Sequence, residues 1–158
     1  MCVAPSAPSS VVRVLPGLHV KTAAGGRDYG VLTPAELIGV PGAPLGVVRQ
    51  WVDEAGSVAL RPGQALPDRV LTVTGTVVTF DTPAGAKAWT SQSVARGGTP
   101  LEAKAGTPPS EARMLRRPGE LTGEIDYLAV FTDGDTAFSL TMVAGGAGGH
   151  DGEFVRLV

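Results

Sequence analysis

The sequence predicts an α+β fold, in which one antiparallel β-sheet packs against two to three helices in a single domain. Three observations support this class. Residues 70–80 form a long β-branched run that is typical of a strand. Residues 125–143 contain two apolar runs joined through Asp133 and Gly134, a strong signal for a β-hairpin. Two Thr-Pro pairs, at Thr33 and Thr82, have the chemistry of helix starts.

Length and composition favour one folded domain. A chain of 158 residues corresponds to about one domain and can bury a sizeable core. The 22 glycines and 13 prolines imply many turns, whereas the 43% hydrophobic content argues against disorder. No apolar run approaches the ~18 residues of a membrane span. We therefore expect a single domain over residues 11–158, preceded by a flexible tether at residues 1–10.

The first part of the domain is expected to begin with a strand and a short helix. Residues 11–20 predict a strand with one Pro-Gly break, and residues 23–30 predict a loop. Thr33 and Glu36 have capping-box spacing around a proline at the first helical position. This pattern predicts a helix that ends near residue 40.

A second helix is predicted over residues 44–55. Apolar residues recur there at helical spacing, and Gly56 is placed to end the helix. The same pattern assigns Trp51 to the core rather than to a ligand platform. The apolar positions are Leu45, Val48, Trp51, Val52 and Ala55.

From residue 57 onward the pattern changes to strands. Residues 57–60 and residues 70–80 are expected to be strands, the second being the strongest strand signal in the chain. Thr82 and Pro83 then predict the start of an alanine-rich helix over residues 84–95.

The remaining part is expected to be one irregular segment, one hairpin and one helix. Residues 99–119 contain four prolines and predict an irregular connection. The hairpin strands are predicted at 125–131 and 137–143, since glycine in the Asp-Gly turn supplies the positive φ that such turns require. A glycine-rich loop is expected at 144–149, and residues 153–158 predict the start of a helix.

Charge is distributed unevenly along the chain. Through Glu120 there are 12 basic and 9 acidic residues, and after it 1 basic and 6 acidic residues. The hairpin region is therefore expected to be acidic. Arg113, Arg116 and Arg117 directly precede it and are expected to neutralise it, with phosphate binding as the alternative. A formal net charge of −2 gives no general attraction to nucleic acid, so no nucleic-acid partner is expected.

The one cysteine, Cys2, is followed by a short leash rich in Pro, Ser and Ala. This start resembles the mature N-terminus of bacterial lipoproteins, which carry a diacylglyceryl group on the sulfur of their first residue. The resemblance implies a lipid anchor at Cys2 as the route to the membrane, with Met1 standing in place of a signal peptide. The alternative is an unmodified cysteine in a frayed terminus and a cytoplasmic domain. A single cysteine excludes an internal disulfide and a cysteine-based zinc site.

Residues 70–143 resemble the soluble domains of actinobacterial secreted lipoproteins and extracytoplasmic sensor-type domains. The resemblance is carried by the long strand, by Thr-Pro-Ala-Gly-Ala-Lys-Ala-Trp at 82–89, and by Val-Phe-x-Asp-Gly-Asp-x-x-Phe-x-Leu at 130–140. Several such families are similar to the Mog1/PsbP-like α+β sandwich, which implies binding rather than catalysis. The chain departs from disulfide-bonded extracellular kinase-sensor domains, because it lacks their cysteines.

Motifs for catalysis, metals and cofactors are absent from the sequence. The glycine-rich stretches do not have the frame of a phosphate-binding loop, and no nucleophile-elbow or HExxH motif occurs. His19 and His150 are too far apart in sequence to predict a metal site, although His150, Asp151 and Glu153 together could bind a cation weakly. We expect no catalytic residues, no metal and no cofactor.

Two clusters are candidates for ligand binding. Arg27, Asp28 and Tyr29 form a polar-aromatic group flanked by glycines, which predicts either a tight loop with a local ion pair or a recognition loop. The arginines at 113, 116 and 117 form the second cluster.

These observations lead to an extracytoplasmic, lipid-anchored, non-catalytic domain that binds or senses an unidentified ligand or envelope protein. An apolar pocket between sheet and helices would support this hypothesis. The alternative is a small hydrolase or transferase that uses His19 or His150 with a carboxylate and a nucleophile in a cleft. A purely structural secreted protein is the third possibility.

Overall fold

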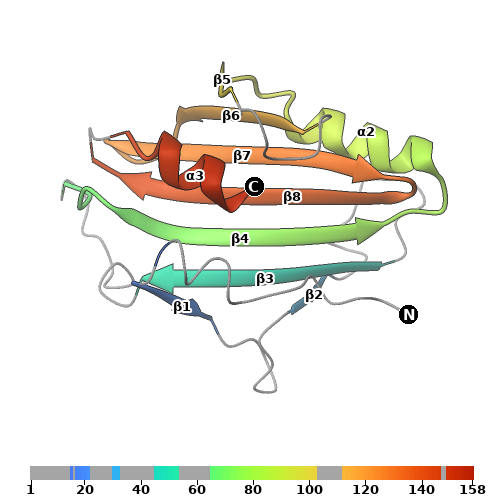
Figure 1. Cartoon of the computed structure of the whole chain (residues 1–158), viewed down its shortest axis with the longest axis horizontal. Helices are drawn as coiled ribbons and strands as arrows, with labels where there is room; N and C mark the ends of the chain where they lie inside the picture. The colour runs from blue at the N-terminus through green and yellow to red at the C-terminus, as the bar shows by residue number, and fades with distance from the viewer. Residues whose placement is uncertain are drawn as a thin grey trace.

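The computed structural model describes residues 15, 17–21, 30–32, 45–53, 65–102, 112–146 and 149–158. In these ranges the chain forms one antiparallel sheet with a helix on each face (Figure 1). The strand order is β1-β3-β4-β8-β7-β6-β5, and β2 also pairs with β3. The elements are β1 Leu18–Val20, β2 Gly30–Leu32, β3 Leu45–Asp53, β4 Val70–Thr79, α2 Pro83–Ser93, β5 Thr99–Pro100, β6 Arg113–Pro118, β7 Glu124–Asp133, β8 Thr136–Gly145 and α3 Asp151–Leu157.

The centre of the sheet agrees with the predicted strand and hairpin. Strand β4 covers all but the last residue of the predicted run, and β7 and β8 pair in continuous register up to Asp133 opposite Thr136. Gly134 has φ +58°, a conformation that favours glycine. Local turn chemistry and β-branched composition were therefore sufficient to predict these three strands.

Helix α2 covers one face of the sheet, which we call the α2 face. Thr82 is its N-cap, and the hydroxyl oxygen of Thr82 accepts a hydrogen bond from the backbone N–H of Gly85 at 3.2 Å. Pro83 occupies the first turn, as predicted. The α2 face is held by two apolar clusters, which consist of Val78, Phe80, Ala86, Ala137 and Trp89, and of Leu115, Leu128, Val130 and Val94.

Helix α3 covers the opposite face, which we call the α3 face (Figure 1). Phe154 is fully buried there, and its ring centroid lies 5.3 Å from that of Tyr127. The larger core cluster lies beneath it and contains Trp51, so the assignment of this tryptophan to the core is confirmed. This cluster also includes Leu18, Val70, Val73, Met114, Ala129, Met142 and Ala144.

The predicted helix over 44–55 is wrong, because residues 45–53 form β3. This strand pairs with β4 along one edge and with β1 and β2 along the other, so it is interior to the sheet. An interior strand carries apolar side chains on both faces, and its sequence then lacks clean alternation. The helical spacing of the apolar residues in this run did not decide its structure, because strand pairing overrides local helix propensity.

The predicted irregular connection over 99–119 is also wrong at two places, where strands form. Residues 99–100 form β5 and residues 113–118 form β6, which pairs with β7. Pro118 lies at the last ladder position, where a missing N–H is tolerated. The predicted glycine loop begins later than expected, since β8 continues through Gly145.

The remaining predicted elements either have different bounds in the structure or lie outside the described residues. Residues 18–20 of the predicted first strand form β1, and Gly30 of the predicted loop begins β2. The predicted tether at 1–10, the helix after Thr33 and the strand at 57–60 lie outside the described residues. The final helix is confirmed and begins at Asp151, two residues earlier than predicted.

Candidate functional site

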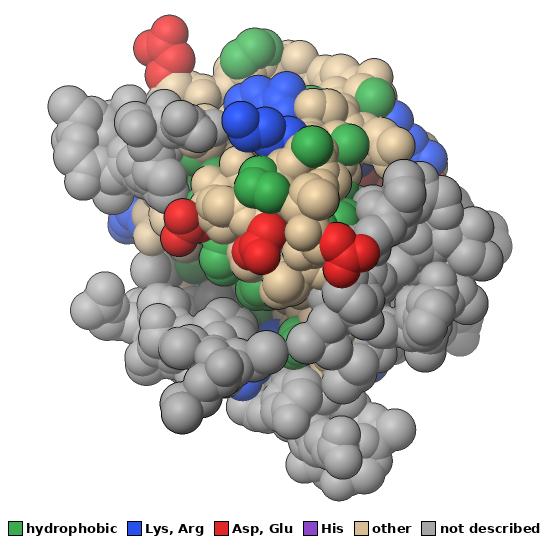
Figure 2. Space-filling view, turned by 90° about the vertical axis from the view of Figure 1, so that its right-hand side faces the viewer, with side chains coloured by type: hydrophobic (Ala, Val, Ile, Leu, Met, Phe, Trp, Pro, Cys, Tyr) green, Lys and Arg blue, Asp and Glu red, His purple; other side chains and the backbone are tan. Residues whose placement is uncertain are grey.

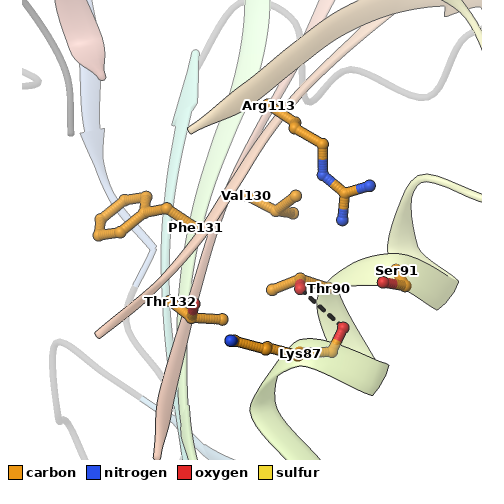
Figure 3. A pocket seen from close by; sticks show the side chains of 7 residues that line it. All are labelled: Lys87, Thr90, Ser91, Arg113, Val130, Phe131 and Thr132. Carbon is orange, nitrogen blue, oxygen red and sulfur yellow. Dashed lines mark hydrogen bonds between the residues drawn. The ribbon is translucent and has the colours of Figure 1, made fainter. Parts of the chain in front are cut away.

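A pocket of about 300 Å³ lies on the α2 face, between α2 and the end of β7 (Figure 3). Its walls come from three elements that are far apart in the sequence. The lining residues are Lys87, Thr90 and Ser91 of α2, Arg113 of β6, and Val130, Phe131 and Thr132 of β7.

Helix α2 contributes its residues through helical spacing. Lys87 and Ser91 are four residues apart and both are exposed, so they lie on one side of the helix. Thr90 lies between them and is only 5% exposed, and its hydroxyl donates a hydrogen bond to the carbonyl oxygen of Lys87 at 3.0 Å. The packing of Trp89 on Phe80, with ring centroids 6.4 Å apart, holds this part of α2 against the sheet.

Strand alternation decides which β7 side chains enter the pocket. Val130 and Thr132 point to the α2 face, whereas the ring of Phe131 points away from the pocket (Figure 3). The Phe131 ring instead stacks on Phe138 with a centroid distance of 4.7 Å and an interplanar angle of 9°. Val130 is therefore the one fully apolar side chain that faces the pocket.

The pocket is positively charged. Lys87 and Arg113 are both exposed, and neither forms an ion pair within the described part of the chain. Figure 3 shows the ammonium group of Lys87 near Thr132 and the guanidinium group of Arg113 directed toward Thr90. No Asp, Glu, His or Cys is among the lining residues. The arrangement can bind an anion but offers no acid–base pair.

The structure divides the predicted arginine cluster. Arg113 lines the pocket, whereas Arg116 lies on the α3 face with its Nη1 2.9 Å from Asp151, and the Nε of Arg117 lies 4.0 Å from Asp126. Alternation along β6 turns Arg116 to the opposite face from Arg113 and Arg117, because successive side chains of a strand point to opposite faces. The expected neutralisation of hairpin carboxylates therefore applies to Arg117 alone, which faces Asp126, whereas Arg116 faces Asp151 of α3.

Arg27, Asp28, Tyr29 and Cys2 all lie outside the described residues.

The second polar cluster surrounds the start of α3. The His150 ring lies between two carboxylates, with Nδ1 2.9 Å from Glu153 and Nε2 3.2 Å from Asp68. The backbone N–H of His150 donates to the Tyr127 hydroxyl at 3.0 Å. Burial raises the pKa of Tyr127, and this hydrogen bond opposes the shift.

This second cluster holds a helix in place rather than forming a cation site. Asp151 faces Arg116 and not His150, so the three residues proposed for weak cation binding do not converge. Among the described residues no group of His, Cys, Asp and Glu has the arrangement of a metal site. His19 lies in β1 and is exposed.

Sequence reasoning missed most of the pocket. Lys87, Thr90, Ser91 and Thr132 were not predicted, although the spacing of Lys87 and Ser91 on a predicted helix was an available signal. These residues share a pocket with Arg113 because β6 is a strand that pairs with β7. The prolines around β6 led to the prediction of an irregular segment instead.

Comparisons with known proteins bear on the fold. No protein-family model matches the chain. No curated protein matches it either. Among solved structures it is similar to the extracellular domain of PknH from Mycobacterium tuberculosis, with a TM-score of 0.52 and 15% sequence identity over 97% of this chain and 90% of that one. The two share a fold. The similar structure is an extracellular domain, and the predicted likenesses to lipoproteins and to the Mog1/PsbP fold stay predictions.

The structural similarity extends over nearly the whole chain, beyond residues 70–143 that carry the predicted resemblance. No helix in the described ranges has the length and apolar character needed to cross a bilayer.

Proposed function

We propose that this chain is an extracytoplasmic, non-catalytic binding or sensing domain whose ligand occupies the pocket between α2 and β7. The observation that carries the proposal is the pair of cations, Lys87 and Arg113, that face a 300 Å³ hollow without a carboxylate partner in it. Binding sites are typically concave and contain a few convergent polar groups that orient the ligand.

The fold likeness supports the extracytoplasmic part of the proposal. The similar solved structure is an extracellular domain, and it covers almost all of this chain. Because the shared fold does not carry a shared ligand, the site itself has to supply the function. Attachment to the membrane would be through a lipid on Cys2.

The enzyme alternative has less support. Both ring nitrogens of His150 contact carboxylates, Asp68 and Glu153, and no hydroxyl or thiol nucleophile contacts that ring in the part of the chain that the structure describes. Moreover, the pocket lies on the opposite face of the sheet from this histidine and contains no titratable acid or base other than its two cations.

The pocket differs from the one expected for a lipid or peptide carrier. An apolar pocket was expected between sheet and helices. In the observed pocket, five of the seven lining residues are polar, and a sixth, Phe131, points its ring away. The ligand class that fits is therefore small, polar and negatively charged.

The test is a map of ligand contacts on the ¹⁵N-labelled domain. The protein is titrated with pooled small molecules extracted from the medium and envelope of its host, and amide shifts are recorded. We expect shifts to concentrate at residues 87–91 and 130–132. Shifts confined to the α3 face, or no saturable shifts with any pool, would contradict the proposed site.

The second part of the proposal is tested by the intact mass of the N-terminal peptide from the native host, produced with its own upstream sequence. A mass raised by acyl chains at Cys2 supports surface anchoring. An unmodified chain that still begins at Met1 would contradict it.

A further inference from the structure

We propose, as an extension of the function proposed above, that the ligand of this pocket is a small phosphate monoester whose phosphate is bound between Lys87 and Arg113. The pocket offers two positive charges, one from α2 and one from β6, and no negative charge among its lining residues. A phosphate monoester carries about −1.5 to −2 charge at neutral pH, which matches two cations, whereas a carboxylate carries a single charge.

The placement of donors also favours a tetrahedral group. Lys87 and Ser91 approach from the helix, Thr132 from β7, and Arg113 from the first residue of β6 (Figure 3). A planar carboxylate is satisfied by one arginine fork, but a phosphate presents oxygens in several directions. Lysine binds a phosphate as a point charge, and arginine binds it through paired N–H groups.

Volume and lining limit the remainder of the ligand. A hollow of 300 Å³ corresponds to about ten water molecules at ~30 Å³ each. This exceeds a phosphate alone and leaves room for a small organic group. Val130 is the one apolar side chain facing the hollow, so the organic group is expected to be polar, such as a short polyol.

The surface beside the pocket excludes large polyanions. Asp81, Asp133 and Asp135 are all exposed at the end of the molecule where the β7–β8 turn lies. Figure 2 faces this end and shows acidic side chains grouped there, with basic side chains farther up. A small phosphoester can reach the cations, whereas a nucleic acid would meet these carboxylates.

The experiment is a calorimetric and NMR titration with glycerol 3-phosphate, inorganic phosphate, acetate and glycerol as probes. We expect glycerol 3-phosphate to bind, inorganic phosphate to bind more weakly, and acetate and glycerol to leave the amides of 87–91 and 130–132 unshifted. Arg113→Met and Lys87→Met should each weaken binding by about tenfold to a hundredfold, since a charge-assisted hydrogen bond contributes about 1.5–3 kcal/mol.

Matched controls come from exposed cations outside the pocket. Arg96→Met and Lys21→Met remove the same charges from residues that do not line it, and both should leave the affinity unchanged. All four positions are exposed, so the variants are expected to remain folded, which amide dispersion will check. Arg113→Lys keeps the charge but loses the paired donors and should give an intermediate loss.

A further arm distinguishes two sources of the phosphate. Vesicles of phosphatidylcholine with one tenth phosphatidic acid present the same group as a lipid headgroup. Binding to these vesicles that depends on Lys87 and Arg113, without binding of glycerol 3-phosphate, assigns the site to a headgroup. The reverse assigns it to a soluble ester.

The outcomes separate this inference from the proposed function. If acetate or glycerol shifts the pocket amides and phosphate does not, the phosphate assignment is overturned and a binding pocket stands. If host extracts and all four probes leave the pocket amides unshifted, both proposals are overturned. Phosphate binding that is unaffected by the Lys87 and Arg113 variants would be adventitious and would also overturn the inference.

Discussion

The Nη1 of Arg116 lies 2.9 Å from both carboxylate oxygens of Asp151, and this contact ties β6 to the first residue of α3. Both side chains are 40% exposed. Water and salt screen a pair of this exposure, which limits its contribution to stability. The pair therefore orients α3 more than it stabilises the fold.

Asp151→Asn is expected to lower the free energy of unfolding by less than about 1 kcal/mol, because exposed ion pairs contribute about 0.2–1 kcal/mol. Urea denaturation at low and high salt measures the change, and the difference from the unmodified chain should shrink at high salt. A loss of several kcal/mol would contradict the screened-pair interpretation.

Phe154→Ala is expected to have a much larger effect, lowering the free energy of unfolding by about 3–5 kcal/mol. The Phe154 ring is fully buried against Tyr127, and its removal leaves a cavity in the core of the α3 face. Leu121→Ala is the control, since Leu121 is 51% exposed and should change stability by less than about 0.5 kcal/mol. Similar urea midpoints for the two variants would show that α3 is not part of the core.

Tyr127→Phe removes the acceptor of the His150 N–H and is expected to cost about 1 kcal/mol, because a partly buried donor loses its partner. The variant also has a signature at high pH. Burial raises the pKa of Tyr127 above its ordinary value of 10.0, so the folded state retains the phenol proton more strongly than the unfolded state.

The stabilisation from this phenol is fully present below pH 10.0 and is lost as pH rises through the folded pKa. The unfolding free energy of the unmodified chain should thus fall more steeply above that pH than the unfolding free energy of Tyr127→Phe. Parallel pH profiles for the two proteins would contradict the role of the buried hydroxyl.

Glu124→Gln is expected to stabilise the protein at neutral pH. Burial, and secondarily the nearby Asp126, raise the pKa of Glu124 above 4.5. The stability linked to its proton is present below pH 4.5 and is lost as pH rises through the folded pKa. Glutamine mimics the protonated form and keeps an oxygen for the Glu120 N–H, which lies 3.3 Å from Glu124 Oε1.

The gain from Glu124→Gln should therefore appear at pH 7 and disappear below pH 4.5, as followed by thermal unfolding at a series of pH values. Glu120→Gln is the matched control, because Glu120 is exposed. An equal gain from both variants would point to a general reduction of negative charge instead.

Gly98→Ala is expected to destabilise the edge of the sheet at β5 and β6. Gly98 has φ +150°, and a Cβ there would lie 2.7 Å from the carbonyl oxygen of Arg116. Backbone atoms must then move apart, which we expect to cost at least about 1 kcal/mol. Gly149→Ala, where a Cβ meets nothing within 4 Å, is the control in the same urea assay. Equal stability of both variants would contradict the close approach.

Local signals predicted the elements whose chemistry is contained in a few adjacent residues. Two predictions are confirmed, the helix start at Thr82 and Pro83 and the turn at Gly134, because each depends on backbone groups within four residues. The strand predicted at 70–80 is confirmed, because its β-branched side chains fit a pleated, partly buried surface.

The failures come from pairing across the sheet. The sequence of β3 is compatible with a helix, and only its position between β4 and the β1 and β2 strands makes it a strand. The sequence of β6 shows arginines and flanking prolines, and only its register with β7 makes it a strand. Such pairings join residues distant along the chain, so no local pattern records them.

The sequence alone therefore determined that an antiparallel sheet packs against helices, and it determined the central hairpin, the start of α2 and the presence of α3. The tertiary structure decided the site. It paired Arg113 with Val130, which places that arginine in the same pocket as Lys87, and it turned Arg116 to the other face. The physical reason is that alternation and register act together across the sheet, and register is set by non-local pairing.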